Sequence, residues 1–188
     1  APTRVEPTEV ASVRQLAEQG NALEQVYLAS MYWSGTGVEQ DYTQAAAWYR
    51  KAAEQGNVNA QYYLGFMYEN GRGVPKDDTQ AVEWWRKAAD QGVAGAQHNL
   101  GVMYAEGRGV WKDDTQAVAW YRKAAEQGNA DALGNLGFMY AEGRGVPQDD
   151  RQAVAWWRRE AEQGNANAHY NLGRAYAIGK GVPQDDVL

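Results

Sequence analysis

Apolar residues recur along the chain at the spacing of amphipathic helices. In residues 57–70 the small and apolar positions fall on one face of a helix. These positions are Ala60, Leu64, Gly65 and Tyr68. Gly71 follows where a left-handed C-terminal cap is expected, and the loop after it, which contains Val74 and Pro75, cannot continue the helix.

A second amphipathic stretch follows each stretch of this kind. It begins at an aspartate with a glutamine three residues later, a pairing that resembles a capping box, and it ends at a glycine. The pairing occurs at Asp41/Gln44, Asp77/Gln80, Asp113/Gln116 and Asp149/Gln152. The apolar face of the second stretch comprises Ala81, Val82, Trp85, Ala88 and Ala89. We therefore predict units of helix, loop, helix and short turn.

The two stretches form a repeat of 36 residues without insertion or deletion. The string A-[ED]-Q-G ends at Gly20, Gly56, Gly92, Gly128 and Gly164, and G-x-G-V starts at Gly35, Gly71, Gly107, Gly143 and Gly179. We predict an N-terminal capping half repeat over 1–20, four full repeats over 21–164 and a C-terminal half repeat with a tail over 165–188. Ten helices are expected, the first near 8–19 and the last near 166–178. Because one helix pair cannot bury its own apolar face, the units must stack.

The residues of this repeat resemble the Sel1-like repeat, a relative of the tetratricopeptide repeat, over about 170 residues. The matching positions of one unit are Leu64, Gly65, Tyr68, Gly71, Gly73, Ala81, Trp84, Ala88, Ala89 and Gly92. The resemblance implies an all-α fold, a right-handed α/α superhelical solenoid of 36-residue helix-loop-helix repeats with a concave groove. Some members carry one disulfide per repeat, but this chain has no cysteine.

The resemblance also indicates where a partner would bind. In tetratricopeptide repeats the groove is lined by the first helix of each unit, at positions −5, −2, +2 and +5 from its leucine. Carried onto this chain, these positions are Leu23, Val26, Ser30, Trp33, Asn59, Tyr62, Phe66, Glu69, Gly95, His98, Val102, Ala105, Asp131, Gly134, Phe138, Ala141, Asn167, Tyr170, Arg174 and Ala177. They vary from unit to unit while the packing positions barely change. Such variation is typical of a differentiated binding surface, although relaxed surface positions vary as well.

The position just before the leucine is asparagine in three units, at Asn99, Asn135 and Asn171. An amide both donates and accepts, so a row of asparagines can pair with an extended peptide backbone, or each can satisfy a neighbouring loop carbonyl. Arg174 can hold a carboxylate or can simply be a solvated side chain. The predicted partner-binding residues are Asn59, Tyr62, Phe66, His98, Asn99, Val102, Asp131, Asn135, Phe138, Asn167, Tyr170, Asn171 and Arg174.

Other candidate sites have a structural explanation. The aromatic pairs Trp48-Tyr49, Trp84-Trp85, Trp120-Tyr121 and Trp156-Trp157 recur in every second helix, which indicates repeat packing rather than a ligand cage. Trp33 and Trp111 each stand where the other repeats have a different residue, and at the position of Trp111 the neighbouring repeats have a proline, Pro75 or Pro147. The doublets Asp77-Asp78, Asp113-Asp114 and Asp149-Asp150 indicate helix capping and dipole stabilisation rather than calcium binding.

No constellation for catalysis, a metal or a cofactor is expected. His98 and His169 lie in different units without cysteine partners, and no serine begins an S-x-x-K motif. A net charge of −6 without a basic stripe makes nucleic acid a poor candidate partner. No apolar run is long enough for direct membrane insertion. Many bacterial family members are exported, so the resemblance slightly favours the bacterial periplasm or secretion over the cytoplasm.

Two functions from different classes fit these observations. The first is a non-enzymatic adaptor or scaffold that binds a protein or extended peptide in the concave groove. The second is a structural assembly subunit of a bacterial envelope complex that uses the convex face and the ends. The last first helix, with Leu172 and Tyr176, is expected to leave part of its packing face uncovered, which suggests a weak homodimer through that end.

Overall fold

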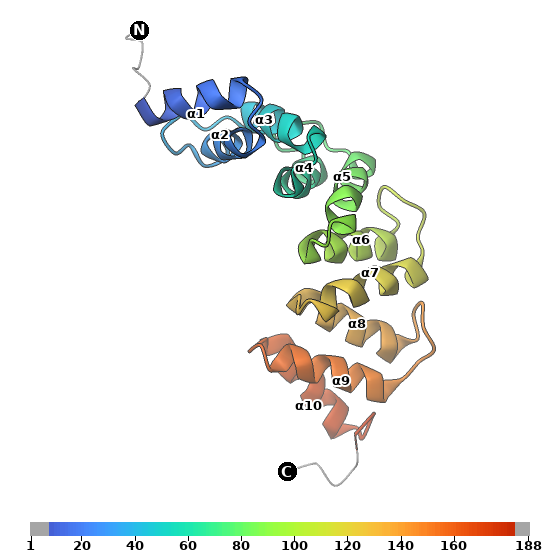
Figure 1. The fold of residues 1–188 in the computed structure, drawn as a ribbon. Coiled ribbons are helices and arrows are strands. Elements are labelled where there is room, and N and C mark those ends of the chain that lie inside the picture. The colour runs from blue at the N-terminus through green and yellow to red at the C-terminus, as the bar shows by residue number, and fades with distance from the viewer. Residues whose placement is uncertain (1–7, 183–188) are drawn as a thin grey trace. The chain divides into compact units, whose positions relative to one another are not determined.

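The computed structural model describes residues 8–182, and over these residues the chain is entirely helical, as predicted. The helices are α1 (Thr8–Glu18), α2 (Ala22–Ser34), α3 (Tyr42–Glu54), α4 (Val58–Asn70), α5 (Asp78–Asp90), α6 (Ala94–Glu106), α7 (Asp114–Glu126), α8 (Ala130–Glu142), α9 (Asp150–Ala161) and α10 (Ala166–Ala177). The even-numbered helices are the first helices of the repeats. The ten expected helices are therefore confirmed within the described range (Figure 1).

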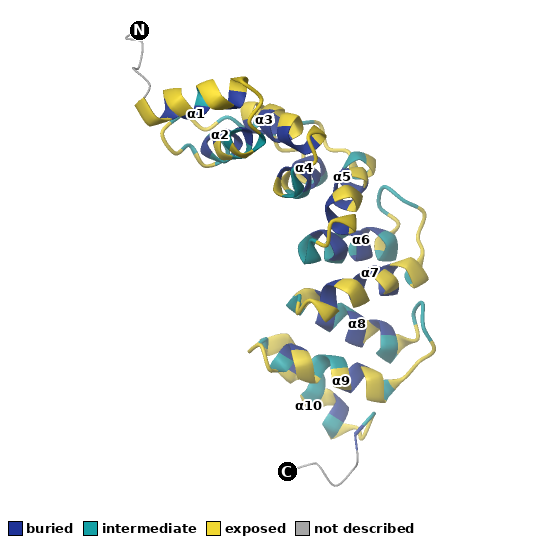
Figure 2. Ribbon diagram, in the orientation of Figure 1, coloured by how far each residue is buried: buried dark blue, intermediate teal, exposed yellow. Residues whose placement is uncertain are grey.

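The chain divides into two compact units, Ala1–Gln91 with α1 to α5 and Gly92–Leu188 with α6 to α10. Within each unit, every helix packs on the helix that follows it in the sequence. Buried positions lie along the sides of the helices that face their neighbours, and exposed positions lie on the other sides (Figure 2). This arrangement buries the apolar stripes that the sequence pattern predicts.

Aspartates cap the N-termini of the second helices α3, α5, α7 and α9, but the capping-box prediction is only partly correct, because in α5 one of its two reciprocal hydrogen bonds does not form. The Asp77 carboxylate accepts from the backbone N–H groups of Thr79 at 2.9 Å and Gln80 at 3.0 Å. In a capping box the Gln80 side chain would bond the Asp77 N–H, yet this N–H donates to the Tyr68 carbonyl at 3.0 Å. The Gln80 amide donates to Glu83 instead, at 2.9 Å. The reciprocal bond is therefore absent because the preceding helix has already satisfied the donor.

Glycine ends the first helices α2, α4, α6 and α8 as predicted, whereas the C-cap of α10 is Ile178. Gly71 has φ 65°, a left-handed conformation in which its N–H donates to the Met67 carbonyl, and Arg72 donates to the same oxygen at 2.9 Å. Gly73 packs so closely against the Tyr42 carbonyl that a Cβ would overlap it. The loop of one repeat therefore lies on the start of the second helix of the repeat before it.

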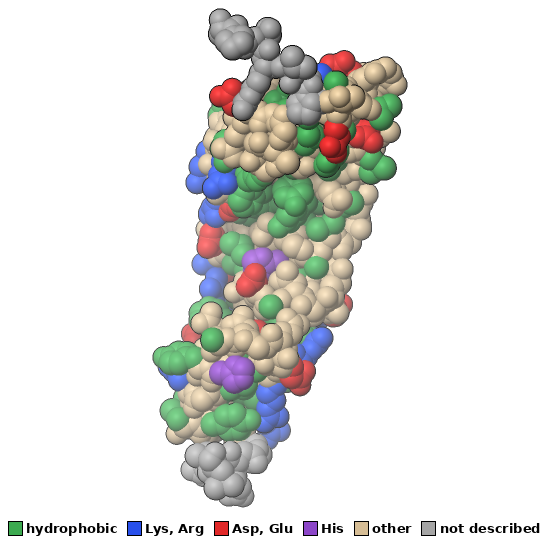
Figure 3. Space-filling view, turned by 90° about the vertical axis from the view of Figure 1, so that its left-hand side faces the viewer, with side chains coloured by type: hydrophobic (Ala, Val, Ile, Leu, Met, Phe, Trp, Pro, Cys, Tyr) green, Lys and Arg blue, Asp and Glu red, His purple; other side chains and the backbone are tan. Residues whose placement is uncertain are grey.

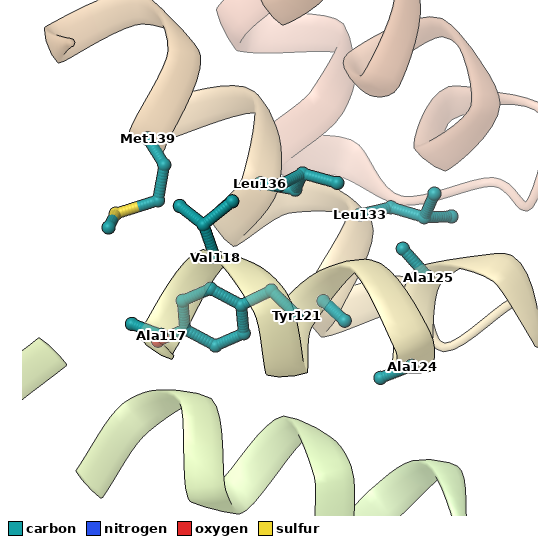
Figure 4. Packing of buried hydrophobic residues seen from close by; sticks show 9 residues of the cluster. Ala117, Val118, Tyr121, Ala124, Ala125, Leu133, Leu136 and Met139 are labelled. Atoms are coloured by element: carbon teal, nitrogen blue, oxygen red, sulfur yellow. The ribbon is translucent and has the colours of Figure 1, made fainter. Parts of the chain in front are cut away.

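The core between repeats combines large and small residues. Between α7 and α8, Val118 and Tyr121 pack against Leu133, Leu136 and Met139 (Figure 4). The aromatic ring needs a matching glycine on the helix at its other side. A Cβ on Gly101 would meet the ring of Tyr121 at 2.5 Å, and one on Gly65 would meet the indole of Trp85 at the same distance.

In both units a buried glutamine of the first helix accepts from a glutamine at the end of the second helix of the same repeat, and in the first unit it also bonds the repeat before it. The Gln61 side chain, 4% exposed, donates to the Ala53 carbonyl at 3.1 Å and accepts from the amide of Gln91 at 2.7 Å. Gln25 and Gln97 accept in the same way from Gln55 and Gln127, each at 2.7 Å. The sequence analysis did not identify these bonds.

Candidate partner-binding face

The predicted groove positions of α8 lie on its exposed side. Asp131 and Phe138 are exposed and Gly134 is partly exposed, whereas the interleaved Leu133 and Leu136 are buried. The corresponding residues of α6 and α10 also remain at least partly exposed. We use the name first-helix face of the second unit for this surface, which comprises His98, Val102, Asp131, Gly134, Asn135, Phe138, Asn171 and Arg174.

Two surface pockets meet at Phe138 on this face. One pocket is lined by Val102 of α6 and by Asn135 and Phe138 of α8. The other is lined by Phe138 together with Asn171 and Arg174 of α10. The Phe138 side chain is 47% exposed and stands between the two. The structure therefore brings four of the predicted partner-binding residues together around the exposed ring of a fifth, Phe138.

Arg144 is a further residue of this face that the sequence analysis missed. Its guanidinium carbon lies 6.0 Å from the centre of the Phe138 ring, and it pairs with the Asp114 carboxylate at 2.7 Å. Hydrogen bonding and charge pairing with Arg144 lower the pKa of Asp114. The second aspartate of this doublet thus holds a loop arginine of the next repeat. An aspartate and an arginine 30 residues apart recur in the sequence, at Asp78/Arg108 and Asp114/Arg144, and this recurrence could have indicated the ion pair.

The asparagines of α6 and α8 contact a histidine. The Nδ2 atom of Asn135 lies 3.1 Å from Nε2 of His98, and the Oδ1 atom of Asn99 lies 3.3 Å from its Nδ1. A neutral imidazole with its hydrogen on Nδ1 satisfies both contacts, and burial lowers the pKa of His98. Asn99 and Asn135 thus bond the imidazole that lies between them, a contact that is neither of the two predicted alternatives.

The first unit carries an aromatic cluster on α4. The rings of Tyr62 and Tyr63 are 5.6 Å apart, and Phe66 packs 5.9 Å from Trp33 of α2. The guanidinium carbon of Arg72 lies 5.3 Å from the Trp33 ring. Figure 3 shows hydrophobic side chains gathered in the upper part of the face turned to the viewer, at the height of α4 in Figure 1. Trp33 and Phe66 are only partly exposed because they cover one another.

The remaining predicted residues are more isolated. Asn59 and Asn167 are exposed near the starts of α4 and α10. Tyr170 is 66% exposed, and the guanidinium carbon of Arg174 lies 5.9 Å from its ring. Leu172, next to them, is only partly buried, whereas the equivalent Leu136 is fully buried. The packing face of α10 is thus less covered than that of α8, as expected.

The aromatic pairs of the second helices are packing residues, as predicted. Trp48, Trp84 and Trp120 are buried, and a lysine ammonium lies 3.8, 3.9 and 4.0 Å from their respective ring centres. The Trp85 indole N–H donates to the Tyr62 carbonyl at 3.1 Å. Trp111 differs: it is 94% exposed in the loop between α6 and α7.

No group of three or more metal-ligating side chains occurs among residues 8–182. His98 lies on α6 and His169 on α10, and neither belongs to such a group in this part of the chain. Over the same described range, no helix has the length and apolar character needed to cross a membrane.

Stacked helix pairs of constant length, joined by glycine loops, define a helical repeat protein. The family model of the Sel1 repeat matches residues 25–57, 58–93, 94–129, 130–165 and 166–188. The chain therefore belongs to the Sel1 repeat family. Proteins of this family are generally protein-interaction scaffolds and generally non-catalytic.

Solved structures with the same fold come from several bacteria. A protective antigen present in uropathogenic Escherichia coli strains matches with a TM-score of 0.91 and 45% identity, over 96% of this chain and 38% of its own. A Sel1 repeat protein from Oxalobacter formigenes matches with a TM-score of 0.85 and 36% identity, over 93% of this chain and 77% of its own. Cysteine rich protein B of Helicobacter pylori matches with a TM-score of 0.56 and 26% identity, over 72% of this chain and 100% of its own. No curated protein sequence matches significantly.

Proposed function

We propose that this chain is a non-enzymatic adaptor that binds an extended segment of a partner protein on the first-helix face of the second unit. The observation that carries the proposal is Phe138, 47% exposed between two pockets on a helix whose packing residues are buried. A large exposed aromatic ring between recesses is the kind of residue on which binding energy concentrates in protein interfaces.

The surroundings of Phe138 suit a peptide. Apolar contact is available from Val102 and Ile178, which line the two pockets on opposite sides of the ring. Asn135 and Asn171 line the same pockets and offer amide groups that can donate to and accept from a peptide backbone. Arg174 adds a cation that can pair with a carboxylate of the partner. Apolar anchors with polar groups around them are typical of specific interfaces.

The proposal is tested by selecting peptides from a phage-displayed library of random 12-residue sequences and comparing their affinity for wild type and Phe138→Ala. We expect the substitution to weaken binding about tenfold or more, because truncation of an interface anchor costs roughly 2 kcal/mol. Trp111→Ala is the matched control, since it removes an even more exposed aromatic side chain from a loop. It should leave the affinity unchanged.

Two outcomes would contradict the proposal. If no peptide is enriched over phage without an insert, the face does not bind extended segments. If Trp111→Ala weakens binding while Phe138→Ala does not, the binding surface is the loop between α6 and α7 and not the first-helix face.

A further inference from the structure

Three positions that meet at one place differ in a single repeat from their equivalents elsewhere in the chain. Asp131 is the only charged residue at its position, where other repeats have Asn59, Gly95 and Asn167. Gly134 stands where the other repeats have Val26, Tyr62, His98 and Tyr170. Glu160 stands where the half repeat at the N-terminus has Leu16 and the other repeats have the buried alanines Ala52, Ala88 and Ala124. Two acids have therefore been added, and one large side chain removed, in the same repeat.

The structure shows that these three changes belong together. A Cβ on Gly134 would meet the Glu160 carboxylate, with Oε1 at 2.9 Å and Oε2 at 3.0 Å. The carboxylate of α9 therefore lies where a side chain of residue 134 would begin. Asp131, one helical turn before Gly134 on α8, lies on the same side of the helix. The absence of a side chain at Gly134 leaves the Glu160 carboxylate directly beneath the first-helix face.

Glu160 has an unsatisfied oxygen. The residue is 3% exposed, and its Oε2 atom has no hydrogen-bond partner. Burying a carboxylate without a partner is costly, so buried acids are normally paired or hydrogen-bonded. Burial, together with the negative charge of Asp131, raises the pKa of Glu160. A cation that approaches over Gly134 would supply the missing partner once the buried Glu160 carboxylate turns toward it, and it would lie near the carboxylate of Asp131.

We propose that the carboxylates of Glu160 and Asp131 form an acidic site at Gly134, which we name the acidic recess, and that this site binds a lysine or arginine side chain of the partner segment. The inference rests on the proposed function, since it names the chemistry of one partner residue on the first-helix face. The position of the recess supports it, because Asp131 and Gly134 lie on the same helix and the same face as Phe138. A peptide anchored at Phe138 can therefore extend along α8 toward the acids.

The recess is also separate from the positive groups of the face. Asp131 acts to raise the pKa of His98, but burial outweighs it and lowers this pKa overall, which favours a neutral imidazole without a competing charge. Arg144 is held by Asp114, and Arg174 lies on α10 beside Tyr170. The face thus has cations around Phe138 and two acids near the start of α8, which fixes the direction in which a peptide with one basic residue would bind.

The test uses peptides selected on wild type from the same phage library. We expect the enriched sequences to share a position occupied by lysine or arginine, separate from the apolar position that depends on Phe138. A double-mutant cycle then compares Glu160→Gln with replacement of that lysine by norleucine in the peptide. Each change alone should weaken binding about tenfold to a hundredfold, and the second change should add little once the first is made.

Glu162→Gln is the matched control, because it removes the same charge from an exposed position at the end of the same helix. It should not couple to the peptide lysine. Replacement of the lysine by norleucine tests the recess with the unaltered chain, so a folding defect of Glu160→Gln cannot hide the answer.

The failure of this inference differs from the failure of the proposed function. If peptides are enriched and depend on Phe138 but share no basic position, or if the cycle is additive, the acidic recess is refuted while peptide binding stands. If no peptide is enriched at all, both fall together.

Discussion

Gly101 and Gly173 occupy the same position in two repeats of the second unit but have opposite surroundings. A Cβ on Gly101 would meet Cδ1 and Cε1 of Tyr121 at 2.5 Å, whereas a Cβ on Gly173 would meet nothing within 4 Å. Substitution by alanine therefore separates two effects at equivalent sites. One is the helix propensity that alanine adds, and the other is the steric cost of the added methyl group.

The magnitudes follow from these surroundings. Alanine in place of glycine stabilises a helix interior by up to about 1 kcal/mol, and we expect Gly173→Ala to gain most of this. The methyl group of Gly101→Ala needs a shift of about 1 Å in a ring that packs among buried residues, and such overpacking costs about 1–3 kcal/mol. Because Tyr121 is 4% exposed and cannot turn into solvent, we expect a cost at the upper end, about 3 kcal/mol, and the gain of about 1 kcal/mol in helix propensity leaves a net loss of about 2 kcal/mol.

The assay is urea unfolding of both variants and wild type, followed by the circular dichroism of the helices. The midpoint should fall for Gly101→Ala and stay the same or rise for Gly173→Ala. Equal shifts of the two variants, or a stabilised Gly101→Ala, would refute the view that the glycine of this position exists to receive an aromatic ring.

Three further predictions concern polar groups inside the repeats. Asp114→Asn should cost less than about 1 kcal/mol of stability at neutral pH, because the ion pair with Arg144 is partly exposed. Since pairing lowers the pKa of Asp114, the contribution of this ion pair to stability is present above about pH 4 and lost below it. Wild type and variant should therefore converge in urea titrations at low pH. The raised pKa of Glu160 has the opposite effect. The contribution of this residue to stability is greatest below about pH 4 and falls as the pH rises above it, so Glu160→Gln should gain stability relative to wild type as the pH is raised from about 4, and a constant difference would contradict this. Gln61→Leu should cost less than about 1 kcal/mol by thermal unfolding, because Leu133 already occupies the equivalent buried position in α8; a loss as large as that of Gln61→Ala would contradict it.

The helices of the fold were predictable because the sequence of each repeat contains the cap residues that mark where its helices begin and end. Gly71 ends α4 in the predicted conformation and Asp77 caps α5, and both depend on contacts between residues close in the sequence. The capping-box prediction failed where a distant group intervened. The carbonyl of Tyr68, nine residues earlier, takes the N–H that Gln80 would have bonded. Local patterns carry no information on such competition.

The candidate face was predictable only in part, for the same reason. Its positions follow from the resemblance to a known repeat, and the structure places Phe138 and Asn171 in adjoining pockets. The meeting of Glu160 with Gly134 was not foreseen, because a glycine and a distant glutamate have no pattern that links them. Comparison of the repeats with one another could have shown it, since both depart from their equivalents in the same repeat.

The most direct test of peptide binding on the first-helix face is to map a selected peptide on the chain by amide chemical-shift changes in nuclear magnetic resonance titrations. Binding at this face predicts that the largest changes occur at and around Asn135, Phe138 and Asn171, on α8 and α10. Changes concentrated at Trp111 and its loop, or on the exposed sides of α7 and α9, would contradict it.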